Sequence, residues 1–222
     1  MKEISVIGLD LAKNVFQIHG VTECGEVLVR KVLRRSQVLQ FFAKCPPCLV
    51  GMEACGGAHY WSREIRRFGH EVKMMAPAFV KPDLKANKND RNDAEAICEA
   101  VQRPSMRFVA AKSPEQQSVL HLHHSRRLLV KQRVAVSNHL RGILSEYGIV
   151  LPQGERVLLQ QLPSLLEDGD NTLPMLMRHT LATLMAHHTQ LAEHIGVLDA
   201  QLQGWHKQDE QSQRLASITG VG

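Results

Sequence analysis

The chain has few aromatic residues, an odd number of cysteines and no long apolar run. Phe, Trp and Tyr make up 5% of its 222 residues, so a core must be mostly aliphatic. No apolar stretch approaches the roughly 20 residues of a membrane helix, and residues 1–20 lack a secretory signal pattern. Five cysteines fit a reduced cytoplasmic protein better than a disulfide scaffold. These absences argue against membrane proteins and secreted disulfide-rich proteins.

One cysteine pair has the spacing of a redox motif, Cys45-Pro-Pro-Cys48. It has no second pair with which to bind zinc. It also precedes a predicted strand, whereas thioredoxin-like motifs open a helix. The sequence therefore argues against thioredoxin-like chemistry.

Basic residues are concentrated in one part of the chain. The net charge is +5, and the isoelectric point of about 9.1 favours an anionic partner. Between Arg107 and Arg141, seven Lys and Arg residues stand against a single acid, Glu115. Such a helix suits a phosphate backbone, although a solvated face is the ordinary alternative. Because aromatic residues do not interleave these charges, structured RNA is favoured over target DNA.

We expect eight cations to contact nucleic acid. Five lie on this helix and three in or beside a basic loop at 77–89: Arg126, Arg127, Lys131, Arg133, Arg141, Lys85, Lys88 and Arg91. Some of the helix charges could instead pair with an acidic segment at Glu167, Asp168 and Asp170.

The first half of the chain alternates strands and helices. Strands are predicted at 4–10, 14–20 and 27–33, with short links that imply antiparallel hairpins. A helix at 36–43, a strand at 48–53, a helix at 58–68, a strand at 70–76 and a helix at 90–103 follow. This order is typical of an RNase H-like (RuvC-like) α/β fold, a mixed sheet with flanking helices.

The second half reads as helical. Leu122, Leu129, Val136 and Ile143 repeat every seven residues within a long helix at 115–148. A broken acidic segment at 151–171 separates it from a second long helix, whose heptad seam at 181–205 contains a buried or interhelical His188. The pattern predicts a coiled-coil arm or dimerisation module. The predicted domains are 1–110, 111–212 and the start of a further domain at 213–222.

Four carboxylates fall where this fold would bring them together. Asp10 and Glu53 end predicted neighbouring strands, and Asp90 and Asp93 begin a helix with both carboxylates on one face. Taken alone, Asp90 is a plausible helix N-cap and Asp10 an ordinary strand-end turn residue. The stretch around Asp10 also begins like the phosphate motif of actin-like kinases, but Ala12 stands where that motif has glycine. Together, the four acids favour a site for hard divalent cations.

Three motifs carry a family resemblance: Ile7-Gly-Leu-Asp-Leu-Ala-Lys13, Glu53-Ala-Cys-Gly-Gly-Ala-His-Tyr-Trp61 and Lys88-Asn-Asp-Arg-Asn-Asp-Ala94. With them the chain resembles the DEDD-type transposases of bacterial insertion sequences. These are relatives of the Piv DNA invertase and are described as bridge-RNA-guided recombinases.

The resemblance implies a catalytic site and a set of partners. Asp10, Glu53, Asp90 and Asp93 would bind Mg²⁺, with Mn²⁺ as an alternative, in a RuvC-like domain that cleaves and joins DNA. The partners would be element-end and target DNA, a structured guide RNA and further copies of the chain, in the bacterial cytoplasm at the nucleoid. A nucleophilic serine would lie in a C-terminal domain beyond residue 222.

Two other functions remain open from the residues. A junction-resolving nuclease of the same fold would use metal-activated water in place of serine. A nucleic-acid-binding dimerisation module would retain the fold with an idle site.

Overall fold

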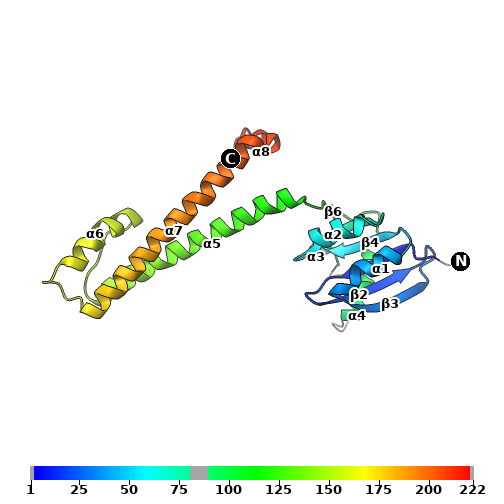
Figure 1. The fold of residues 1–222 in the computed structure, drawn as a ribbon, viewed down its shortest axis with the longest axis horizontal. Coiled ribbons are helices and arrows are strands. Elements are labelled where there is room, and N and C mark those ends of the chain that lie inside the picture. The colour runs from blue at the N-terminus through cyan, green and yellow to red at the C-terminus, as the bar shows by residue number, and fades with distance from the viewer. Residues whose placement is uncertain (1–2, 81–89, 221–222) are drawn as a thin grey trace. The chain divides into compact units, whose positions relative to one another are not determined.

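The chain divides into two compact units. The computed structural model describes residues 3–80 and 90–220 (Figure 1). The first unit covers Met1–Ser113 and the second Pro114–Gly222. The two units are described separately below.

A six-stranded mixed sheet forms the centre of the first unit. Its strands are β1 (Val6–Asp10), β2 (Val15–Val21), β3 (Val27–Arg34), β4 (Leu49–Glu53), β5 (Glu71–Met75) and β6 (Phe108–Val109). Their order is β3-β2-β1-β4-β5-β6. The first three strands pair antiparallel, β4 and β5 join in parallel, and β6 closes the edge antiparallel to β5. The predicted RNase H-like α/β fold is confirmed, and β6 is an addition that its two residues were too few to signal.

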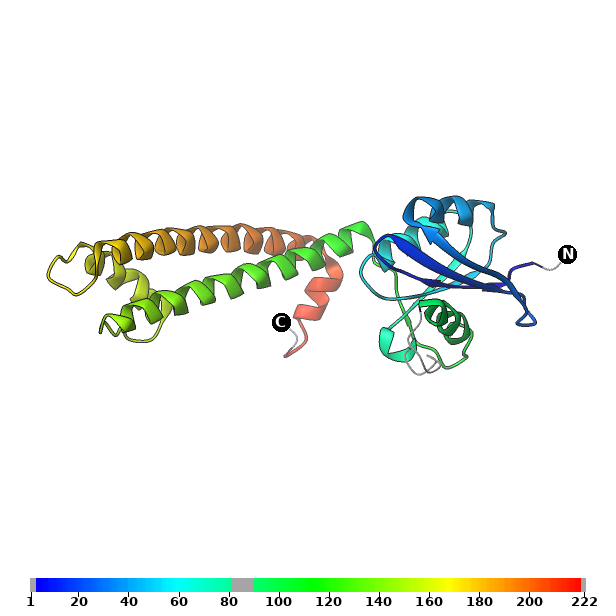
Figure 2. The same cartoon turned by 90° about the horizontal axis from the view of Figure 1, so that it is seen from below.

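Helices cover both faces of this sheet (Figure 2). The 3₁₀ turn η1 (Arg35–Gln37), α1 (Val38–Lys44) and α2 (Ala58–Arg66) lie on one face. The other face is covered by α3 (Pro77–Val80) and α4 (Asp90–Ala100). Side chains alternate along β1, so Ile7 and Leu9 enter the first core and Val6 enters the second. The predicted basic loop at 77–89 is wrong for its first four residues, which form α3 and bury Val80 in the core beside α4, while residues 81–89 lie outside the described part of the chain.

Two glycines let α4 lie directly on the sheet backbone. Gly8 and Gly51 are paired in register on β1 and β4. A Cβ atom at Gly8 would lie 2.0 Å from the carbonyl oxygen of Ala94, and one at Gly51 would lie 2.7 Å from Cβ of Val101. Any larger side chain at either position would therefore push α4 away from the strands.

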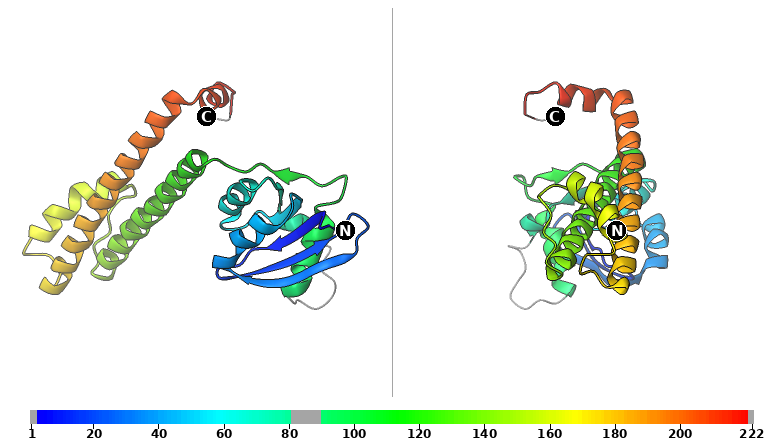
Figure 3. Two further views of the ribbon diagram at one scale, coloured as in Figure 1. Left: turned by 45° about the vertical axis from the view of Figure 1, so that its right-hand side comes forward. Right: turned by 90° about the vertical axis from the view of Figure 1, so that its left-hand side faces the viewer.

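The second unit is built on a helical hairpin. Its helices are α5 (Pro114–Glu146), α6 (Glu155–Glu167), α7 (Met175–Gln208) and α8 (Glu210–Ala216). Helices α5 and α7 run antiparallel, side by side (Figure 3). The predicted seam of α7 is buried at Leu181, His188, Leu191 and Ile195. No helix in the described part of the chain combines the length and the apolar character needed to cross a membrane.

The segment after α5 is more ordered than its sequence suggested. Residues 151–171 were expected to be broken by prolines and glycine, yet α6 spans thirteen of them with Pro163 inside the helix. Leu158 and Leu162 lie one turn apart on α6 and are fully buried with Leu140 and Leu144 of α5. This apolar contact explains why the helix forms despite its proline.

Candidate metal centre

Asp10 and Glu53 end neighbouring parallel strands. The β1–β4 register runs from Val6 opposite Leu49 to Leu9 opposite Met52. The next residue on each strand is Asp10 and Glu53, respectively, and both side chains are half-buried. The sheet therefore brings these two carboxylates to the same edge, as the sequence analysis expected of this fold.

The third described acid, Asp93, is delivered by α4. Ala94 of α4 lies over Gly8 of β1. One helical turn later, the Cys98 thiol lies 3.9 Å from the carbonyl oxygen of Val6. The start of α4 therefore points toward the end of β1 that carries Asp10. Oδ1 of Asp93 is buried, and the described residues offer it no hydrogen-bond partner. A buried carboxylate oxygen in this condition is costly unless something absent from the protein chain neutralises it.

The carboxylates act electrostatically on one thiol. Burial raises the pKa of Cys55, and the negative charges of Glu53 and Asp10 raise it further. The thiolate form of Cys55 is disfavoured because two negatively charged carboxylates lie nearby. Both acids therefore lie near enough to the loop between β4 and α2 to affect the ionisation of Cys55.

The donor set fits a divalent cation. Carboxylate oxygens are the ligands that Mg²⁺ and Mn²⁺ prefer, and an unsatisfied buried Asp93 oxygen is an available donor. Within residues 3–80 and 90–220, however, no cluster of three or more metal-binding side chains is already assembled. Asp90 begins α4, but its side chain lies outside the described part, as do that of Arg91 and the whole of Lys85 and Lys88.

A cationic and aromatic rim lies beside the Asp10 edge. The loop after β1 carries Lys13, whose carbonyl oxygen accepts a hydrogen bond from Arg35 at 3.4 Å. The Arg35 guanidinium also lies over the Trp61 ring, 5.0 Å from its centroid. Trp61 contacts exposed Tyr60, with ring centroids 5.2 Å apart. The sequence analysis missed this rim, since its members come from three separate segments.

Three of the predicted nucleic-acid-binding arginines make contacts inside the helical unit. Arg126 forms a two-pronged ion pair with Asp199 of α7. Nε of Arg133 lies 3.4 Å from Glu155. The guanidinium of Arg141 donates to backbone carbonyls at Leu151, Pro152 and Gly154, at 2.7–3.0 Å.

The acids that serve these arginines differ from those expected. Asp199 and Glu155 replace the anticipated Glu167, Asp168 and Asp170, because α6 and α7 pack along α5 and bring their own acids to it. Arg127 and Lys131, by contrast, are exposed one helical turn apart on α5.

The sheet order and the positions of these acids define the fold class. A mixed sheet with carboxylates at the ends of adjacent central strands, and a third on the helix that crosses them, is an RNase H-like arrangement. A family model described as "Transposase", that of the DEDD transposases of the IS110 type, matches residues 7–149. The chain belongs to this DEDD transposase family.

Curated relatives carry transposase names. A "probable family 20 transposase" of Pseudomonas aeruginosa is 46% identical over 99% of this chain and 65% of its own length. The transposase for insertion sequence element IS1328 of Yersinia enterocolitica is 43% identical over 100% of this chain and 66% of its own. The transposase for insertion sequence element IS1111A of Coxiella burnetii is 41% identical over 100% of this chain and 61% of its own length. The chain thus spans just under two thirds of the length of these relatives.

Proposed function

We propose that this chain forms the metal-binding and nucleic-acid-binding part of an insertion-sequence transposase that cleaves and joins DNA. Asp10, Glu53, Asp90 and Asp93 are proposed to hold Mg²⁺ or Mn²⁺. The observation that carries the proposal is that Oδ1 of Asp93 is buried with no hydrogen-bond partner among the described residues. Asp93 lies near the start of α4, which is directed toward the sheet edge that carries Asp10 and Glu53. Family membership and the transposase names of the relatives support it.

The bound cations would neutralise charge at a scissile phosphodiester. The chain's own residues would bind and orient the DNA strand. Exposed Lys13 and Arg35 present positive charge beside the acidic edge, and exposed Tyr60 offers a ring on which an unpaired base can stack. The ring of Trp61 packs against the guanidinium of Arg35.

The attacking group is proposed to come from outside the three motifs. The resemblance supplies a serine in a C-terminal domain, and the relatives are longer than the matched span. In the alternative, metal-activated water attacks and the protein resolves DNA junctions. Replacing that serine in the longer protein would distinguish the two mechanisms, because only an enzyme that uses water would still cleave DNA.

We further propose that α5 binds nucleic acid through Arg127 and Lys131, with a structured guide RNA as the favoured partner. Both side chains are exposed and no ion pair occupies either among the described residues. The hairpin of α5 and α7 is proposed to associate with a second copy. Its outer surface exposes Leu128 and Val197 to 55% and 56%. DNA and RNA partners would place the protein with the chromosome in the bacterial cytoplasm.

The metal proposal is tested by calorimetric titration of Mg²⁺ and Mn²⁺ into the purified chain. Asp10→Asn, Glu53→Gln and Asp93→Asn should each weaken binding at least about tenfold, a loss on the scale seen when a metal site is damaged. Glu71→Gln is the matched control, since Glu71 lies on β5 and pairs with Lys73 at 3.0 Å. Thermal unfolding of each variant verifies that it is folded. Equal affinity in all four variants would contradict the proposed site.

A further inference from the structure

The Cys45-Pro-Pro-Cys48 segment forms a defined pair of thiols at the end of α1. Cys45 caps this helix, and its N–H donates to the carbonyl oxygen of Phe41 at 3.1 Å. Cys48 directly precedes β4 and is 8% exposed. Both thiols are free. Only two prolines separate Cys45 from Cys48, and each cysteine shifts the pKa of the other, so the two side chains lie near one another.

A buried histidine is aimed at the second thiol. His70 is 4% exposed, and its Nδ1 accepts a hydrogen bond from the backbone N–H of Cys48 at 3.2 Å. Nδ1 must therefore carry a lone pair, which leaves the ring proton on Nε2, where it donates to the carbonyl oxygen of Phe42 at 3.0 Å. The same Nδ1 lies 3.4 Å from Sγ of Cys48. His70 thus fixes the position of Cys48, because one of its ring nitrogens binds the Cys48 backbone and the other binds α1.

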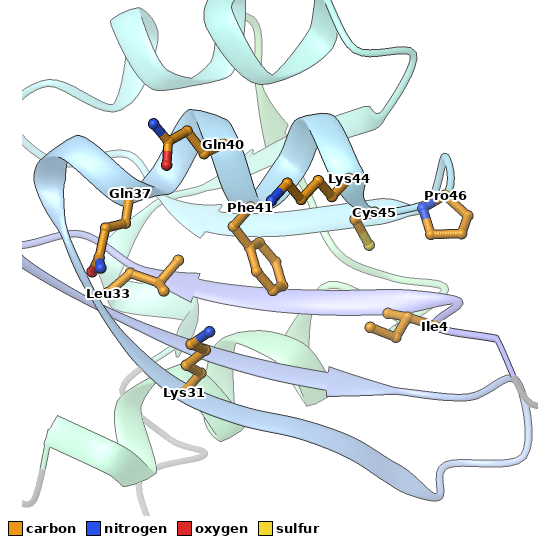
Figure 4. A pocket seen from close by; sticks show the side chains of 9 residues that line it. All are labelled: Ile4, Lys31, Leu33, Gln37, Gln40, Phe41, Lys44, Cys45 and Pro46. Carbon is orange, nitrogen blue, oxygen red and sulfur yellow. The ribbon is translucent and has the colours of Figure 1, made fainter.

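The two thiols differ in access. Cys45 lines one end of a cavity of about 380 Å³ between α1 and β3, whereas Cys48 does not contribute to its wall. Figure 4 shows Phe41 projecting from α1 into this cavity and Lys31 rising from β3 opposite it. Lys44 also lines it, so a ligand entering the cavity meets positive charge. A small anionic molecule can therefore reach Cys45 but not Cys48.

The electrostatics follow the same asymmetry. The hydrogen bond from Cys48 lowers the pKa of Cys45, even though the C-terminal end of a helix disfavours an anion. That hydrogen bond and burial raise the pKa of Cys48 well above its usual range. A reactive thiol is one that ionises and is accessible, and only Cys45 meets both conditions.

We propose that Cys45 and Cys48 are a thiol–disulfide exchange site for low-molecular-weight disulfides that carry carboxylates, with Cys45 attacking and Cys48 resolving. The Cys45 thiolate attacks one sulfur of RS–SR, forms a mixed disulfide and releases RS⁻. Cys48 gives its proton to the released RS⁻, attacks Sγ of Cys45 and releases the second RS⁻, which takes up from water the proton that Cys45 lost on ionising. The protein loses two protons and two electrons, and the small disulfide is reduced to two thiols.

The product joins the end of α1 to the start of β4, the strand whose other end carries Glu53. An excess of small thiol reverses both steps. In a reducing compartment such a bond is transient, as is usual for redox-responsive pairs there.

The test uses the whole purified chain and oxidised glutathione as the probe. After blocking and tryptic digestion, the peptide 45–63, which contains Cys45, Cys48 and Cys55, should lose two hydrogens and show a Cys45–Cys48 link on fragmentation. Cys55→Ser should retain that link. In Cys48→Ser, one glutathione should remain on Cys45, while in Cys45→Ser none should appear on Cys48. Excess reduced glutathione should restore both thiols.

Two comparisons make the proposal falsifiable without relying on the buried residues. Cys45 should react several-fold faster than Cys24, which is exposed on the turn between β2 and β3. Glutathione disulfide should outpace the uncharged hydroxyethyl disulfide, and Lys44→Gln should reduce that preference. Faster modification of Cys24, or no adduct on Cys45 in Cys48→Ser, would show that the pair is only packed. Equal rates for the two disulfides would overturn the anionic substrate.

Discussion

Gly8 and Gly51 lie opposite each other on neighbouring parallel strands, and both face α4. Each lacks the Cβ that would collide with this helix, at the carbonyl of Ala94 and the side chain of Val101, respectively. The position of α4 in turn decides where Asp93 lies relative to Asp10. The glycine pair is therefore as much a part of the candidate metal centre as the acids themselves.

Replacing Gly8 with alanine should displace α4. The new Cβ would meet the Ala94 carbonyl at 2.0 Å, and a backbone atom cannot yield as a side chain can. Such overpacking costs about 1–3 kcal/mol, measured as the free energy of unfolding in urea. Metal affinity should fall with it, because Asp93 moves.

Gly196→Ala is the control for the glycine experiment. Gly196 lies in α7 with open space around it, so alanine there should stabilise the protein by about 0.5–1 kcal/mol. If Gly8→Ala is as stable as the original chain and binds metal equally well, the close approach of α4 has no role in forming the site.

Truncating Leu191 should destabilise the helical hairpin. Leu191 is 4% exposed in the seam between α7 and α5, and Leu→Ala at buried positions costs about 2–5 kcal/mol. Leu176→Ala, at a position 72% exposed on the same helix, should change the unfolding free energy little. Equal effects of the two substitutions would argue that the seam is not packed in solution.

His188 should make the stability of the hairpin depend on pH. It is fully buried near Glu155, with Nε2 at 3.3 Å from Oε1, and Arg133 also faces that carboxylate. Burial lowers the pKa of His188, and this outweighs the opposing effect of Glu155. Since the unfolded chain then takes up a proton first, stability should fall as pH drops below the usual histidine pKa of about 6.5.

The measurement is the difference between the original chain and His188→Leu, which leaves the other histidines in place. Unfolding free energies at about pH 7.5 and about pH 5.5 should fall more for the original chain. A steeper fall in the variant would mean that protonated His188 gains more from Glu155 than it loses by burial.

Arg126 and Arg127 are a matched pair with different expected roles. Arg126→Ala should lower the melting temperature, since its guanidinium binds Asp199, and should leave RNA affinity largely intact. Arg127→Ala should weaken RNA and DNA binding without changing the melting temperature, because its side chain is exposed. In a salt series, losing one phosphate contact reduces the log–log slope by about 0.9 for duplex DNA and about 0.7 for single strands.

The pair also offers a pH check. Arg126 holds the pKa of Asp199 below its ordinary value, so that ion pair stabilises the protein above this value and its contribution is lost as pH falls into the acid range. Arg126→Ala should remove that acid dependence. If instead the two variants lose nucleic-acid affinity equally, the Asp199 ion pair does not exclude Arg126 from binding.

Local pattern was sufficient for the parts of this protein that depend on neighbouring residues. Strand alternation, glycine breaks and the heptad stripe predicted the central strands and both long helices, because each arises from short-range periodicity. It failed at α3 and α6, where long-range burial of Val80, Leu158 and Leu162 stabilises elements that local propensity does not favour. It also missed β6, a two-residue strand that depends on pairing with β5.

The sequence by itself determined which acids the protein possesses, their order in three motifs, the RNase H-like succession of elements and the basic character of α5. Only the tertiary structure decided which of those charges remain available. Arg126, Arg133 and Arg141 are drawn into contacts with α6, α7 and the connecting loop, while Arg127 and Lys131 stay exposed. The same holds for Asp93, because the burial of its Oδ1, without a partner among the described residues, depends on how α4 rests on two glycines. A residue's type fixes its charge, but its partners depend on contacts between segments far apart in the chain.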